Sequence, residues 1–146
     1  MADVLKVVAA IAIVVAAFKA FADWVERKHR EKIESVFGGR QALDERAFYE
    51  KYFQASGVPA YVVTGIRRIL ERALAEDLSR LSDEDDFTGN LKFFFEEDDW
   101  AAIEVLEEIE KEFAVSFSRE DGLRMRKVKD IVNLTWERIR QQHESR

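Results

Sequence analysis

The feature that most constrains this chain is an apolar run near its N-terminus. Residues 7–18 read VVAAIAIVVAAF and include no polar side chain. Lys6 and Lys19 bracket the run, and they are the only charged residues between Val4 and Ala22. As a helix, the nineteen residues from Val4 to Ala22 would extend about 28 Å, close to the roughly 30 Å hydrocarbon core of a bilayer. The run therefore predicts a single membrane-anchoring helix.

The flanks of the run predict how this helix would sit in a membrane. Trp24 falls where an interfacial aromatic residue belongs, and the basic residues of positions 27–32 follow it directly. Because basic flanks stay in the cytoplasm, we expect a single-pass inner (plasma) membrane protein with residues 25–146 cytoplasmic. The side chains expected to contact lipid are Val7, Val8, Ile11, Val14, Val15, Phe18 and Trp24.

Two other interpretations of the run stay open. A cleaved signal peptide would explain its short length, and Ala20-Phe21-Ala22 fits the small-x-small cleavage pattern. A helix packed into a soluble bundle would normally carry a polar face, and residues 7–18 have none.

The rest of the chain is typical of an all-α protein. It has 6 glycines and 1 proline, fewer than the many turns of an all-β domain would need. We expect the first helix to continue to Phe37, where Gly38-Gly39 ends it. The predicted organisation is an anchor with a basic extension (1–37), a short helical connector (38–58) and a helical domain (59–146).

Apolar spacing places the helices of the second part. We expect helices over residues 44–56, 60–75, 98–113 and 126–142, with connections over 76–97 and 114–124. Leu78, Leu81, Phe87 and Leu91 should fill the core from the long connection. In the 98–113 helix, the predicted apolar positions are Trp100, Ile103, Val105, Leu106, Ile109 and Phe113. In the following connection they include Leu123.

Charge is segregated along the chain, which has a net charge of −6. Residues 83–121 carry 3 basic and 15 acidic side chains, a balance of −12. A block this acidic repels nucleic acid and attracts basic protein surfaces.

Residues 60–140 resemble acyl carrier proteins. DDWAAIEVLEEIEKEF (98–113) is similar to the second helix of that family, where a DSL motif precedes an E-L-x-x-x-L-E-E-E-F pattern. AVSF and MRKVKDIV (125–132) then fill the places of the family's extended segment and T-V-x-x-x-I run, without a gap in the register. The resemblance implies an acyl-carrier-like bundle with the layout helix, long loop, helix, short loop, helix.

One position departs from the family in a way that bears on function. Asp99 stands where the resemblance places the serine that accepts the phosphopantetheine arm, and no serine lies between Ser82 and Ser116. A carboxylate cannot form that phosphodiester, so we expect no cofactor. In carrier-like folds this acidic helix is the recognition face for basic partners. The predicted partner-binding residues are Asp99, Trp100, Glu104, Glu107, Glu108 and Glu112, with Phe94 and Phe95 from the aromatic triplet before the helix.

Signals of catalysis and metal binding are weak. The chain has no cysteine, no Gly-rich phosphate loop, no Gly-x-Ser-x-Gly and no His-Glu-x-x-His. The run Asp83–Asp86 does not fit a calcium-binding EF-hand loop, because position twelve counted from Glu84 is Phe95 rather than glutamate. We expect a non-enzymatic membrane-anchored docking module without a metal. The alternatives are an accessory subunit of a larger membrane complex and an atypical acyl carrier.

Overall fold

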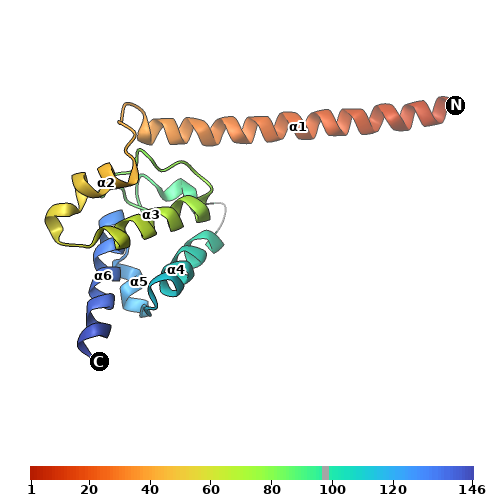
Figure 1. Ribbon diagram of the computed structural model, residues 1–146. Helices are drawn as coiled ribbons and strands as arrows, with labels where there is room; N and C mark the ends of the chain where they lie inside the picture. The colour runs from red at the N-terminus through yellow and green to blue at the C-terminus, as the bar shows by residue number, and fades with distance from the viewer. Residues whose placement is uncertain (97–98) are drawn as a thin grey trace. The chain divides into compact units, whose positions relative to one another are not determined.

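The chain forms an all-α structure in two compact units, residues 1–38 and 39–146 (Figure 1). The computed structural model describes residues 1–96 and 99–146, with the side chain of Asp99 outside the described part. Within these residues there is no β-strand, only an isolated bridge between Asp86 and Lys127. The fold class predicted from the sequence, a long N-terminal apolar helix followed by a small helical bundle, is therefore confirmed.

The first unit is the single helix α1, Ala2–Phe37. As predicted, it continues without a break from the apolar run through the charged segment, where ion pairs such as Arg30 with Glu26 (2.7 Å) join successive turns. It ends at Gly38-Gly39, where Gly39 has a left-handed φ of 78°. In the described chain, α1 is the one helix whose length and composition suit a membrane span or a signal sequence. All seven side chains predicted to contact lipid are exposed.

The second unit is a helical bundle built around α3, Ala60–Leu74. This helix packs against α2 (Glu45–Tyr52), α4 (Asp99–Phe113) and α6 (Val128–Glu144), as Figure 1 shows. Asp44 begins α2 as predicted, its Oδ1 accepting a hydrogen bond from the Ala47 amide at 2.7 Å. The helix is shorter than predicted because the chain passes into a 3₁₀ turn, Gln54–Ser56, and then through Gly57 at φ 81°. The compact unit begins at Gly39 and so includes the segment 39–58 that precedes α3.

The long connection between α3 and α4 is well packed despite having little regular structure. Leu78, Leu81, Phe87 and Leu91 are buried, as the sequence predicted. A short 3₁₀ turn, Lys92–Phe94, lies near its end. These apolar side chains explain how a connection of this length stays fixed on the bundle.

Three of the apolar positions named for the second half do not contribute to the core. Trp100 and Ile103 in α4 are 74% and 47% exposed, because the helix buries the face of Ala101, Val105 and Ile109 instead. Leu123 is also exposed: its segment forms the helix α5, Arg119–Arg124, in place of the predicted connection, and α5 buries Asp121 instead.

A capping box and an ion pair fix α5. The Ser118 side chain accepts from the Asp121 amide, and the Asp121 carboxylate accepts from the Ser118 amide at 2.9 Å. Asp121 is buried and also accepts from Arg138 Nε of α6 at 3.0 Å. The Arg138 guanidinium, with the Ser118 amide, lowers the pKa of Asp121 to about 2. The pair therefore stays charged at neutral pH and ties α5 to α6.

Candidate docking site

The exposed face of α4 combines one large aromatic side chain with several carboxylates. Trp100, Glu104 and Glu107 are all exposed and follow each other at helical spacing, so they share one face. Glu108 is half-buried one position further round the helix. Within the described residues, α4 thus presents an acidic surface with an apolar residue at its N-terminal end.

The remaining predicted partner-binding residues are placed differently. Glu112 is exposed but lies toward α3, where its charge helps raise the pKa of Arg68, whose main partner is Glu45. Phe94 is buried, and Phe95 is half-buried with its ring centroid 5.4 Å from that of Phe87. The predicted role of Asp99 lies outside the described part, which includes its backbone but not its side chain. The structure therefore gathers Trp100, Glu104 and Glu107 on one surface and leaves Phe94 little area for a partner.

An apolar pocket of about 240 Å³ lies on another side of α4. Its floor is formed by four buried side chains, from α3, the long connection, α4 and α6 in turn: Leu70, Phe87, Val105 and Ile131. Its half-buried rim is formed by Phe95, Ala102, Leu106 and Met125. Thr88 and Gly122 complete the lining at exposed positions. None of these ten side chains is charged, so the pocket suits an apolar group.

A network of charged side chains holds the loop that supplies Phe87 and Thr88. Its centre is the carboxylate of Asp85, whose side chain is 3% exposed. Arg40 donates to both of its oxygens, at 2.8 and 3.0 Å, and the Ser82 amide and Asn90 Nδ2 each donate at 2.8 Å. Four donors to one buried carboxylate satisfy its hydrogen-bonding capacity and offset its desolvation.

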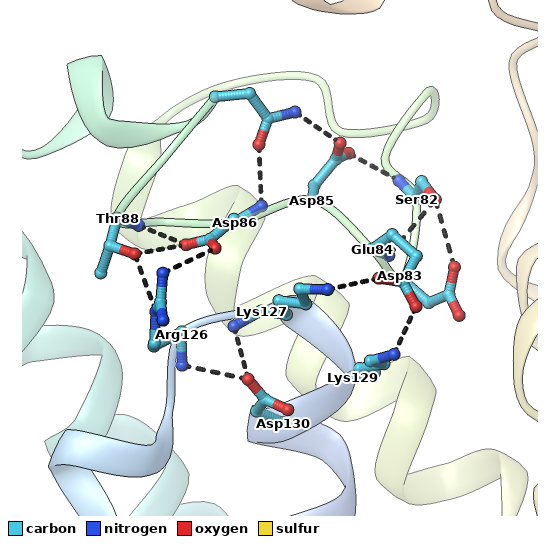
Figure 2. Close-up of polar contacts among 11 residues, drawn as sticks. Ser82, Asp83, Glu84, Asp85, Asp86, Thr88, Arg126, Lys127, Lys129 and Asp130 are labelled. Carbon is cyan, nitrogen blue, oxygen red and sulfur yellow. Dashed lines mark hydrogen bonds and ion pairs between the residues drawn. The ribbon is translucent and has the colours of Figure 1, made fainter.

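The same loop is joined to the start of α6, as Figure 2 shows. Glu84 pairs with Lys127 (2.6 Å) and with Lys129, and these cations lower the pKa of Glu84. Asp86 accepts from Thr88 Oγ1 at 2.6 Å, and the Thr88 contacts lower the pKa of Asp86. Thr88 Oγ1 in turn accepts from Arg126 Nε at 3.1 Å.

Backbone hydrogen bonds strengthen this junction. The Phe87 amide donates to the Arg126 carbonyl at 2.8 Å, and the Val128 amide donates to the Asp85 carbonyl at 3.0 Å. The acidic run of residues 83–86 is thus a structural junction that positions one wall of the pocket. Across residues 1–96 and 99–146, no group of three or more metal-binding side chains comes together.

Sequence reasoning missed both the pocket and the role of Asp85. A pocket depends on side chains from α3, the long connection, α4, α5 and α6 meeting in space, which periodicity does not report. A signal for the junction existed, since the −12 balance of residues 83–121 precedes a +4 balance over residues 122–146. No protein-family model, curated protein or solved structure matches this chain.

Proposed function

We propose that this chain is a non-enzymatic docking module, anchored in the inner (plasma) membrane by α1, whose second unit binds a basic protein surface from the cytoplasmic side. The observation that carries the proposal is that one chain has both an exposed apolar helix, α1, and an exposed face on α4 that combines acidic side chains with Trp100. The sequence resemblance of residues 98–113 to the second helix of acyl carrier proteins agrees with it, because that resemblance implies a recognition face on this helix.

The anchoring part of the proposal rests on the exposure of α1. The most apolar 18-residue window of the helix has no buried residue. Its apolar side chains therefore stay exposed to water unless lipid or another protein covers them. The basic residues that follow Trp24 favour the cytoplasmic orientation.

The docking part rests on the chemistry of α4. Glu104 and Glu107 would attract a Lys/Arg-rich surface over about 8–10 Å, the distance beyond which physiological salt largely screens charges. Trp100, 74% exposed, would supply contact area, since tryptophan is enriched among residues that dominate binding energy. The same negative charge disfavours nucleic acid.

We expect charge reversal on α4 to separate docking from folding. In Glu104→Lys/Glu107→Lys, capture of the native partner from solubilised membranes should fall at least tenfold, because attraction becomes repulsion. Both side chains are exposed, so each substitution should change the free energy of unfolding by only about 0.5 kcal/mol. Quantitative mass spectrometry of the captured protein and a thermal melt measure the two effects.

Glu50→Lys/Glu144→Lys is the matched control, since both residues are exposed and lie on α2 and α6. It makes the same charge change and should leave capture intact. Capture that survives the α4 reversal and also survives high salt would rule out electrostatic docking through this helix.

An accessory-subunit role is the second candidate, and a feature of α1 favours it. Ala12, Ala16 and Ala20 are exposed and four residues apart, which gives the helix one face suited to close packing against other membrane helices. Purification in mild detergent distinguishes the two: a subunit stays in a large assembly when the α4 face is reversed, whereas a docking module is released.

A further inference from the structure

We propose that the apolar pocket between α4 and α5 receives a single bulky apolar side chain, of phenylalanine or leucine size, from a basic amphipathic helix of the partner. This inference rests on the proposed docking function and names the anchor of that same site. The juxtaposition that carries it is an open apolar cavity whose rim residue Leu106 is followed round α4 by the exposed Ile103 and then by Glu107 of the acidic face.

The pocket has the size and lining for such a side chain. Its volume is about 240 Å³. In other proteins an apolar cavity of about 150 Å³ stays dry and takes up a benzene-sized ligand. The floor residues Leu70, Phe87 and Ile131 would surround an entering ring with aliphatic and aromatic contacts. A cavity with this floor loses dispersion contacts when empty, and an apolar occupant restores them.

The one polar side chain among the lining residues, Thr88, is already engaged. Thr88 Oγ1 donates to Asp86 Oδ1 and accepts from Arg126 Nε. A polar occupant would therefore lose its bonds to water and gain little in return, which selects an apolar one.

Gly122 keeps the α5 side of the pocket open. Glycine is a poor helix former, yet it lies in the middle of α5 and lines the pocket. A Cβ atom added there would meet no atom within 4 Å. A larger side chain at this position would therefore extend into free space and compete with an occupant, without displacing the protein's own atoms.

The surroundings of the pocket indicate the chemistry of the partner. Ile103 of α4 is exposed and lies one helical turn before the rim residue Leu106. The exposed Leu123 follows the lining residue Gly122 in the sequence of α5. Glu104 and Glu107 lie on the exposed face of the same α4 helix. A helix with an apolar stripe and flanking lysines or arginines complements both features, as in other helix-in-groove complexes. Anionic lipid headgroups would be repelled by the same carboxylates.

The test uses the full chain in phosphatidylcholine nanodiscs and two synthetic helical peptides of alanine and arginine. One peptide carries a single central phenylalanine, and the other has alanine in its place. Empty nanodiscs give the lipid background. We expect the phenylalanine peptide to bind the wild-type protein at least tenfold more tightly than the alanine peptide. Gly122→Leu should abolish this preference, whereas Gly122→Ala, which adds only a methyl group, should largely keep it.

A thermal midpoint that does not fall in Gly122→Leu shows that the variant is folded. The proposal is overturned if the wild-type protein binds the two peptides equally, binds neither, or keeps its tenfold preference after Gly122→Leu. Equal binding of both peptides that disappears in Glu104→Lys/Glu107→Lys would overturn the pocket while leaving the docking function in place.

Discussion

Replacing Asp85 with alanine should lower the free energy of unfolding by about 2–3 kcal/mol, because its buried carboxylate accepts charge-assisted hydrogen bonds while the Arg40 left behind, 33% exposed, can still be hydrated. The carboxylate has four donors, from Arg40, Ser82 and Asn90, and all would lose their acceptor at once. The loop that carries Phe87 would also lose one of its contacts with the segment before α2, where the Leu43 amide would still donate to the Ser79 carbonyl. Chemical denaturation of the protein in detergent, followed by tryptophan fluorescence, measures the change.

Glu84→Ala is the matched control in the same acidic run. Glu84 is exposed and pairs with Lys127 and Lys129, which are themselves more than a third exposed. Exposed ion pairs contribute about 0–1 kcal/mol, so this variant should unfold nearly like the wild type. If the two substitutions destabilise the protein equally, Asp85 is not the centre of the junction.

The second large effect is expected for Ile109→Ala, which should destabilise the protein by about 2–5 kcal/mol. Ile109 is 0% exposed and lies on the face of α4 that packs against α3. Truncation would remove apolar contacts and leave a cavity between these helices. The midpoint of urea unfolding at an unchanged m-value reports the loss.

Ile103→Ala makes the same chemical change on the exposed side of the helix. Because Ile103 is 47% exposed, the free energy of unfolding should change by about 0.5 kcal/mol or less. Similar losses in the two variants would mean that α4 is rotated about its axis relative to the structure described here.

The comparison of these two isoleucines also indicates what a sequence can and cannot predict. Both are among the apolar positions that the sequence analysis names in the 98–113 helix. Spacing defines an apolar arc, but neighbouring helices decide which part of that arc they cover. Here α3 and α6 cover Ala101, Val105 and Ile109, and they leave Trp100 and Ile103 outside.

The features that sequence predicted well depend on local physics. The continuity of α1 and its end at Gly38-Gly39 follow from helix propensity and from the conformational freedom of glycine. The buried leucines of the long connection were predicted because an isolated apolar residue in a polar loop has few other places to go. The helix α5 was missed although its capping box, Ser118 and Asp121, is visible in the sequence.

The candidate site was predicted only in part. The acidic face of α4 is a property of one helix, so its spacing could be read directly. The pocket and the burial of Asp85 depend on contacts between residues far apart in the chain, such as Arg40 with Asp85. Four consecutive acidic residues look alike in a sequence, and only their partners distinguish the buried one from its exposed neighbours.

Alkaline carbonate extraction of native membranes measures whether α1 is a retained anchor, which docking at a membrane requires. We expect the protein to stay in the membrane pellet and to keep its N-terminal residues, as shown by mass spectrometry of the intact chain. Release into the soluble fraction, or a mature chain beginning at Asp23, would contradict the account.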